Sequence, residues 1–168
     1  MSASLSYEDA VDLLDADHKL AQKLFLEYQA MCDDGAPPGA RQKLALKICS
    51  ELTTHAQIEE EIFYPRVGEA IGDDTLMEKA LEDHAEAKDA IARIQGMAPS
   101  DEAYDETVQQ LGQSIMDHVM TEREQIFLKA RYSTADLRGM VPELYARKKK
   151  LQGGSPASKP AGKKKVKS

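Results

Sequence analysis

The stretch His55-Ala-Gln-Ile-Glu59 places a histidine four residues before a glutamate, and the chain repeats this pattern in His118-Val-Met-Thr-Glu122. Residues four apart lie on one face of a helix, so each pattern directs an imidazole and a carboxylate to the same point. Neutral imidazole and carboxylate together are a ligand set suited to iron, manganese or zinc. The two stretches therefore predict a helical bundle with a site for two metal ions.

Helix-breaking residues divide the sequence around these stretches into four long segments. Glycine or proline marks breaks at residues 33–39, 65–72 and 96–100, which are predicted to be loops. Ser6, Asp73 or Asp74, and Ser100 or Asp101 are suited to cap the helices that follow them. Short connections between long helices favour antiparallel neighbours, so we expect an all-α fold, an antiparallel up-down four-helix bundle. Its helices are expected near residues 7–32, 41–64, 74–96 and 102–131.

Two further segments are expected after the bundle. A short fifth helix is predicted near residues 134–150, capped by Ser133 or Thr134 and kinked or interrupted at Pro142. Residues 151–168 hold five lysines and no acidic residue, a composition typical of a disordered basic tail. The expected organisation is a metal-binding bundle over residues 1–132, a short C-terminal helix over 133–150 and a disordered Lys-rich tail over 151–168.

The hydrophobic pattern indicates where the four histidines of the chain point. Each predicted long helix carries apolar residues at three- and four-residue spacing, as a core-facing stripe does, and each stripe includes one histidine. With a rise of about 1.5 Å per residue in antiparallel helices, all four histidines fall near one middle layer. The third stripe reads Met77, Leu81, His84, Ala87, Ile91 and Ile94. The other three pass through His18, through His55 and Glu59, and through His118 and Glu122.

The two glutamates weigh against a core without metal. A lone histidine on an apolar stripe is usually a core residue hydrogen-bonded to a neighbour, so a network of His–Glu hydrogen bonds is the alternative. A buried carboxylate is costly unless it is paired or bound to metal, and half-satisfied networks are costly as well. The stripes supply no basic partner for Glu59 or Glu122 except Lys88, one position off the stripe. A bound cation is therefore favoured.

Composition narrows the classes of function. Of the 22 basic residues five lie in the tail, so residues 1–150 hold 17 against 29 acidic residues, a net charge of −12. An acidic body argues against nucleic-acid binding, except weakly through the tail. Cys32 and Cys49 are expected to be reduced thiols. No apolar run approaches the ~18 residues of a membrane span, and no signal-peptide pattern is visible, so we expect a cytoplasmic monomer or weak oligomer.

The order of these residues over four helices resembles the hemerythrin-like family, the HHE cation-binding domain. The stretch His55-Ala-Gln-Ile-Glu-Glu-Glu-Ile-Phe-Tyr-Pro65 is similar to the typical bacterial segment, and Asp17-His18 and Glu122-Arg-Glu-Gln-Ile-Phe127 also fit. The resemblance covers about residues 7–132. It implies two iron ions with a bridging oxo or hydroxo group, bridged by Glu59 and Glu122 and capped by the histidines; manganese or zinc is less favoured.

The chain departs from the oxygen-carrying members of that family at one ligand. Those proteins have a fifth histidine, four residues from another on the third helix, where this chain holds Ala80 and Lys88 around His84. Glu51, one turn before His55, could fill the place, although it is also typical of an ordinary solvated position, and so could water. Six expected metal ligands remain: His18, His55, Glu59, His84, His118 and Glu122.

The absence of the fifth histidine affects which function we expect. With fewer protein ligands both irons keep exchangeable positions, and open positions favour chemistry over storage. We expect a non-haem di-iron protein that reacts with or senses O₂, peroxide or nitric oxide, in oxidative stress or iron homeostasis. Catalase-like peroxide decomposition is the candidate enzymatic activity. The alternatives are metal storage or O₂ binding without catalysis, and a helical binding module in which the metal is structural.

Overall fold

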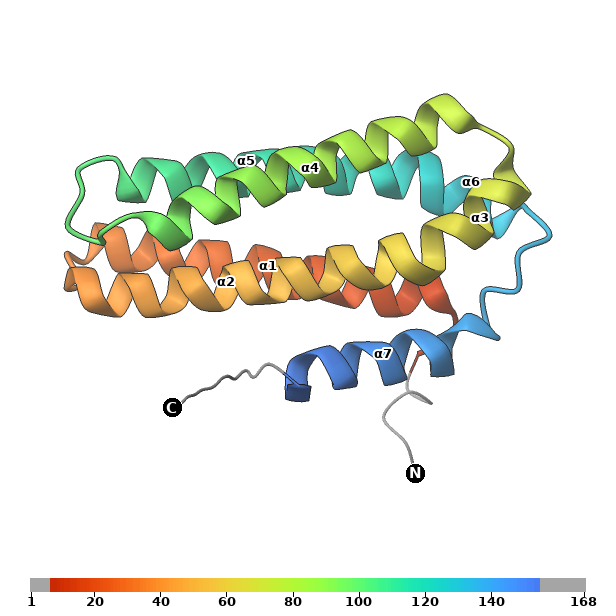
Figure 1. The fold of residues 1–168 in the computed structure, drawn as a ribbon, viewed down its shortest axis with the longest axis horizontal. Helices are drawn as coiled ribbons and strands as arrows, with labels where there is room; N and C mark the ends of the chain where they lie inside the picture. The colour runs from red at the N-terminus through yellow and green to blue at the C-terminus, as the bar shows by residue number, and fades with distance from the viewer. Residues whose placement is uncertain (1–6, 155–168) are drawn as a thin grey trace, which may run out of the picture.

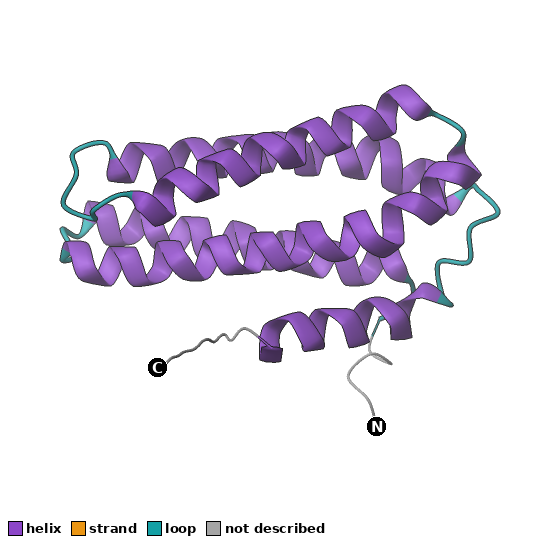
Figure 2. Cartoon of the chain, viewed as in Figure 1, coloured by secondary structure: helices purple, strands orange, loops and turns teal. Residues whose placement is uncertain are grey.

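All regular structure over residues 7–154, which the computed structural model describes, is helical (Figure 2). Two long helices each contain a short π-helical segment: η2 (Glu59–Phe63) joins α2 to α3, and η3 (Glu122–Phe127) joins α5 to α6. The chain therefore forms four long continuous helices, as predicted, which are called rods below: α1, α2–η2–α3, α4 and α5–η3–α6. The α-helices are α1 (Ala10–Asp33), α2 (Pro38–Ile58), α3 (Tyr64–Ile71), α4 (Asp74–Gly96), α5 (Tyr104–Thr121), α6 (Leu128–Arg131) and α7 (Met140–Gly154).

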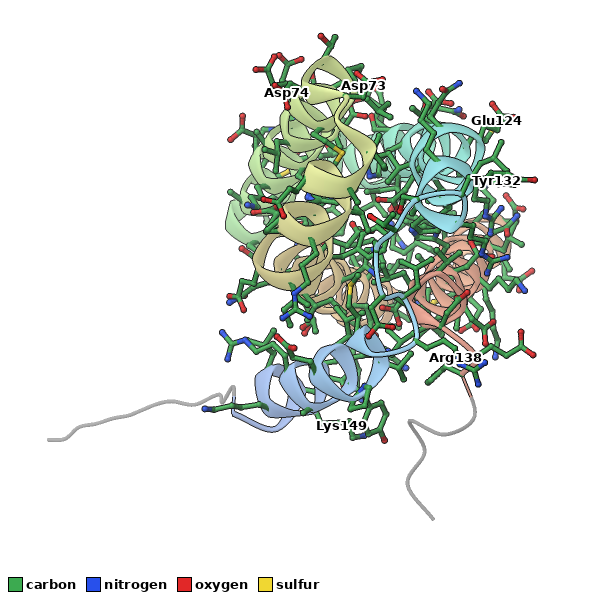
Figure 3. The ribbon with its side chains drawn as sticks, turned by 90° about the vertical axis from the view of Figure 1, so that its right-hand side faces the viewer. Asp73, Asp74, Glu124, Tyr132, Arg138 and Lys149 are labelled. Atoms are coloured by element: carbon green, nitrogen blue, oxygen red, sulfur yellow. The ribbon has the colours of Figure 1, made fainter. Side chains whose placement is uncertain are left out.

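The rods form an antiparallel up-down four-helix bundle. α1 packs against α2 and α5, and α4 packs against α2 and α5, so that each rod contacts two others (Figure 1). In the end-on view of Figure 3, Asp73 and Asp74 lie at the turn that leads into α4, and α7 lies outside the bundle. α7 covers α1, α2 and η2. No helix within residues 7–154 is both long and apolar enough to cross a lipid bilayer.

Local sequence signals explain where the helices begin and end. α1 starts after Asp9, whose carboxylate accepts a hydrogen bond from the Asp12 amide at 2.8 Å, whereas the predicted cap Ser6 lies outside the described residues. Asp73 caps α4 as predicted, accepting from the Leu76 amide at 3.1 Å. α3 ends at Gly72, whose φ of 72° is a left-handed conformation that glycine adopts without strain.

The interior consists of two apolar clusters with a polar layer between them. The first cluster, at the end of the bundle that holds α3 and α6, includes Leu14, Ile58, Ala80 and Ile126. The second, towards the α1–α2 loop, includes Ala21, Leu52, Ala90 and Leu111. On every rod the histidine lies between the residues of the two clusters. The polar layer consists of His18, His55, Glu59, His84, His118 and Glu122 and is called the histidine layer below.

Two predictions about the core and the breaks were wrong. Leu81 was placed on the buried stripe but is 47% exposed, and Ala80 is buried in its place. The predicted break at Pro65 does not occur, because the helix continues to Ile71. η2 widens the turn just before Pro65, and this gives room to a ring that clashes with the preceding turn of a regular helix.

The C-terminal segment also differs from the prediction. α7 spans Met140–Gly154, later at both ends than the predicted 134–150, so residues 151–154 belong to it and not to the tail. Ser133 does not cap it; its Oγ accepts from the Ala135 amide at 3.1 Å and closes the preceding turn. Pro142 lies in the first turn of α7, where its missing N–H has no intrahelical partner to lose, and it does not interrupt the helix. The rest of the predicted disordered tail lies outside the described residues.

Candidate metal centre

The structure brings all six predicted site residues together in the histidine layer. Each of the four rods contributes one buried histidine, and the two rods that contain π segments each contribute a glutamate as well. Glu59 and Glu122 are fully buried, with 0% of their surface exposed. Two carboxylates that are completely removed from water need positive charge close by.

The six residues divide into two adjacent groups of candidate donors. One group contains His18, His55, Glu59 and Glu122, and the other contains Glu59, His84 and His118. Within each group one donor atom per residue lies within 4.8 Å of all the others. Glu59 belongs to both groups, so its carboxylate lies between the two places where a cation would be held. The arrangement suits a pair of neighbouring metal ions that share a carboxylate.

The spacing of the donor atoms matches that of a metal coordination shell. Two donors that each lie about 2.1 Å from one cation, at right angles, are about 3.0 Å apart. The Nε2 atoms of the four histidines lie near this distance from a glutamate oxygen. The distances are 2.9 Å for His18–Glu122, 3.3 Å for His55–Glu59, 3.1 Å for His84–Glu59 and 3.8 Å for His118–Glu122.

Unsatisfied polar atoms are concentrated in the same layer. In the described part of the chain, five buried side-chain nitrogen or oxygen atoms have no hydrogen-bond partner, and four of them belong to the histidine layer. Such atoms cost about 1–3 kcal/mol each when they are left unpaired. Two of them lie close to an opposite charge, His18 Nε2 to Glu122 Oε1 and His55 Nε2 to Glu59 Oε1, but none makes a well-aligned hydrogen bond, and a cation would satisfy all four. They are His18 Nε2, His55 Nε2, Glu59 Oε2 and Glu122 Oε1.

Without a metal ion, protons on the histidines and on Glu122 balance the negative charge of the layer. Burial lowers the pKa of His55, but the negative charges of Glu59 and Asp17 outweigh it and hold this pKa well above its ordinary value. Burial and the charge of Glu59 raise the pKa of Glu122. Burial also raises the pKa of Glu59, yet the facing His55 and His84 bring it well below its ordinary value. A metal ion would therefore compete with these protons.

Tyr64 is a functional candidate that the sequence analysis missed. Its hydroxyl donates to Glu122 Oε2 and, at 3.2 Å, to Glu59 Oε1, and it lies 3.3 Å from His84 Nε2 and 3.4 Å from His118 Nε2. Burial raises the pKa of Tyr64 well above its ordinary value, and the two glutamates raise it further. The hydroxyl thus adds one more donor atom to the group formed by Glu59, His84 and His118.

The π segment η2 explains how Tyr64 reaches the layer. In a regular α-helix, residues five apart point about 140° away from each other, so a tyrosine five positions after Glu59 would face elsewhere. The Tyr64 amide instead donates to the carbonyl of Glu59, an i→i−5 bond that brings both side chains to the same face. The expectation of uninterrupted α-helical periodicity hid this residue.

Each histidine is also held from outside by a carboxylate. The Nδ1 atom of every one of the four lies within hydrogen-bonding distance of an acidic side chain, which directs Nε2 into the layer. Carboxylate partners of this kind are typical of metal-bound histidines because they fix the ring and its tautomer. The pairs are His18–Asp15 at 3.1 Å, His55–Asp17 at 2.9 Å, His84–Glu60 at 2.7 Å and His118–Asp83 at 3.0 Å.

A basic residue lies behind each of these carboxylates. Each histidine, its carboxylate and the basic residue behind it form a chain of three charged or polar groups, called a relay below. The relays could not be predicted from the sequence because most of them join residues of different helices. The outer pairs are Arg123–Asp15 at 2.6 Å, Lys148–Asp17 at 2.5 Å, Lys88–Glu60 at 2.9 Å and Lys79–Asp83.

The residues considered for the missing fifth histidine have other positions. Ala80 packs in the first apolar cluster. Lys88 forms its ion pair with Glu60 and not with the buried glutamates. Glu51 is half-buried at the wall of the cavity described next and belongs to neither donor group found within residues 7–154. None of the three takes the place that Tyr64 occupies.

A small cavity adjoins the histidine layer. It offers about 40 Å³ to the centres of water-sized molecules, and all four histidines contribute to its wall. A single water needs roughly 10–15 Å³ by this measure, so the cavity has room for a molecule of a few atoms and not for an organic substrate. Apolar atoms form most of the surface of its wall. The apolar side chains are Ala21, Leu52, Ala56, Ala87, Ile91, Ile115 and Val119.

Comparisons with known proteins agree with this geometry. The family described as the hemerythrin HHE cation binding domain matches residues 9–130. A DNA nickase from Nostoc sp. is 32% identical over 143 residues, which are 84% of this chain but 39% of that protein, so the chain spans well under half of its relative. The crystal structure of a hemerythrin HHE cation binding domain-containing protein from Mycobacterium kansasii superposes with a TM-score of 0.71 at 18% identity, covering 87% of this chain and 88% of that one.

Proposed function

Because this chain belongs to the hemerythrin HHE cation-binding family, we propose that its histidine layer holds two iron ions that react with O₂, peroxide or nitric oxide. In this proposal His18 and His55 hold one iron, His84 and His118 hold the other, and Glu59 and Glu122 lie between them. An iron pair supplies the redox chemistry that such ligands require. We also propose oxidative stress as the setting and the cytoplasm as the location, since Cys32 and Cys49 are free thiols.

The donor set supports the presence of two metal ions. The four orphaned atoms, the spacing near 3 Å and the sharing of Glu59 by both donor groups are what a di-metal site requires. Imidazole and carboxylate donors without thiolate are compatible with iron, manganese or zinc. Iron is proposed because of the family to which the chain belongs.

We further propose that Tyr64 supplies the seventh protein donor. Its hydroxyl lies 3.2–3.4 Å from Glu59, His84 and His118, the spacing of neighbouring donors around one cation. The iron on the His84–His118 side would then have more protein ligands than its neighbour. When Tyr64 binds as a phenolate, its proton leaves the layer, as the protons of the histidines do.

The cavity is the observation that favours a small reactive ligand. Apolar side chains surround about 40 Å³ next to the histidines, which suits a molecule of two to four atoms and excludes larger substrates. All four histidines form part of its wall, whereas the Tyr64 side chain does not line it. Exchangeable positions on the proposed irons would face this space. This supports chemistry with O₂, peroxide or nitric oxide over simple metal storage.

A peroxide assay tests the reactive function. Iron-loaded protein is mixed with hydrogen peroxide, and released oxygen is followed with an electrode, with an equal amount of free iron as the reference. A catalase-like protein exceeds free iron, and the Ile115→Phe variant, which fills the cavity, falls well below wild type at equal iron content. Turnover no faster than free iron in the wild type would refute the enzymatic proposal, and rapid anaerobic binding of nitric oxide would then favour sensing.

DNA nicking is a second candidate function, and the similarity to the DNA nickase from Nostoc sp. is what supports it. The net charge of −12 over residues 1–150 opposes contact with DNA phosphates, and the chain matches 39% of that protein. Incubation of supercoiled plasmid with iron-loaded and with chelator-treated protein distinguishes the two proposals. Relaxed circles that form only with loaded protein, and not with free iron, would support nicking.

A further inference from the structure

The fifth helix α7 lies outside the part of the chain that matches the family, yet it reaches the histidine layer. The family match ends at residue 130, and α7 begins at Met140. The helix is anchored on the bundle by Leu144, which is fully buried, and by the ion pair between Arg147 and Glu61 at 2.7 Å. In Figure 1 it runs alongside α1 and α2 in the half of the bundle towards α3 and α6, and it ends near the middle.

Lys148 connects α7 to one of the four histidines. Its Nζ lies 2.5 Å from Asp17 Oδ1, and the other oxygen of the same carboxylate lies 2.9 Å from His55 Nδ1. The two contacts fix the rotation of the Asp17 carboxylate, because each oxygen has its own partner. His55 in turn presents Nε2 to the layer, 3.3 Å from Glu59 Oε1 and without a well-aligned hydrogen bond.

The relay through Lys148 differs from the other three in its burial. The side chain of Lys148 is 17% exposed, compared with 40% for Arg123, 55% for Lys88 and 60% for Lys79. Exposed ion pairs are screened by water and contribute little, whereas a pair that is largely withdrawn from solvent is screened less and acts more strongly on its neighbours. Of the four relays, only this one carries a largely buried cation to the edge of the layer.

We propose that Lys148 is a positioning residue of the metal centre, acting through Asp17 on His55, so that α7 sets the redox properties of the iron on the His18–His55 side. The proposal rests on the metal centre proposed above. The ammonium group neutralises part of the negative charge of the Asp17 carboxylate, which makes the imidazole of His55 a weaker electron donor. Positive charge near an iron also favours its reduced form, so both effects raise the midpoint potential.

Redox titration of the full-length, iron-loaded protein tests this role. The midpoint potential is followed through the ferric absorption spectrum for wild type, Lys148→Met and Lys148→Arg. Lys148→Met should shift the potential downward, while Lys148→Arg, which keeps the charge, should stay close to wild type. Lys148→Gln, which keeps a hydrogen-bond donor without charge, should shift in the same direction and serves if the methionine variant does not fold.

Two matched controls separate positioning from general charge and packing effects. Lys88→Met removes the exposed cation of the His84 relay, and Lys150→Met removes an exposed charge from α7 itself. Lys150→Met should leave the potential near that of wild type, and Lys88→Met should shift it by clearly less than Lys148→Met does. A Lys148→Met shift no larger than that of Lys88→Met overturns the inference. Failure of the wild type to bind two irons would instead overturn the proposed metal centre, and iron content is therefore measured first.

Discussion

Tyr64 and Phe127 occupy equivalent positions, each five residues after the glutamate of a His-x-x-x-Glu stretch and each stacked on a histidine of another helix. The ring of Tyr64 lies 5.3 Å from that of His84, and the ring of Phe127 lies 5.5 Å from that of His18. Tyr64 directly follows η2, and Phe127 is the last residue of η3. Only Tyr64 carries a hydroxyl, so it adds one donor atom to the His84–His118 side of the layer.

The Tyr64→Phe variant tests whether that hydroxyl binds metal. It keeps the stacked ring and removes the donor, so ferric protein should lose the visible charge-transfer absorption of a phenolate bound to iron while retaining its fold. Tyr28→Phe is the control, because the Tyr28 hydroxyl donates to Asp105 at 2.6 Å, outside the histidine layer. A spectrum that is identical in wild type and Tyr64→Phe would show that the hydroxyl is not a ligand.

Glu122→Gln should make the metal-depleted protein more stable. Burial and the charge of Glu59 raise the pKa of Glu122, so the neutral side chain relieves an unfavourable interaction between two carboxylates. We expect a higher free energy of unfolding at neutral pH, measured by urea denaturation with chelator present. A lower free energy of unfolding would favour a structural network of His–Glu hydrogen bonds without metal.

Metal affinity should rise with pH from acid to beyond neutrality. The pKa of His55 is held well above 6.5, so its ring keeps a proton over a wider pH range than an ordinary histidine and a metal ion must displace that proton. The apparent affinity therefore increases until the pH passes this raised pKa and falls steadily below it. Competition with a chromophoric chelator from pH 5 to 9 measures it; an affinity independent of pH would contradict this assignment.

Tyr104→Phe should stabilise the protein without affecting metal. The Tyr104 hydroxyl is buried in the second apolar cluster and has no hydrogen-bond partner among the described residues. Removing the hydroxyl removes the cost of burying an unpaired polar group. We expect the free energy of unfolding to rise by about 1 kcal/mol, which thermal unfolding can detect. Unchanged iron content is expected. A lower melting temperature would indicate that water pairs with this hydroxyl in solution.

The part of the site that follows regular helical spacing could be predicted from the sequence. Each histidine lies on a three- and four-residue apolar stripe, and Glu59 lies four residues after His55, so the layer could be placed before the fold was known. The antiparallel bundle follows from the same stripes and from the short loops. On the third rod Ala80 packs inside instead of the predicted Leu81. The hydrophobic pattern does not reveal this shift by one position.

The remaining features depend on irregular or long-range structure. Tyr64 needs a π turn, and the same turn lets the helix pass through Pro65, which by sequence is a helix breaker. The carboxylates behind the histidines come mostly from other helices, so their pairing follows from packing and not from local spacing. Lys148 is 131 residues from Asp17, and only the docking of α7 brings the two together.

Metal stoichiometry tests the central claim most directly. Elemental analysis of protein purified without added metal, combined with the absorption spectrum of an oxo-bridged iron pair, should give two irons per chain. His55→Ala and Glu122→Ala should each lower that number, and Tyr104→Phe should retain it. Wild-type protein that binds no metal at its purified concentration, or variants of His55 and Glu122 that keep two irons, would contradict a di-iron centre built from the histidine layer.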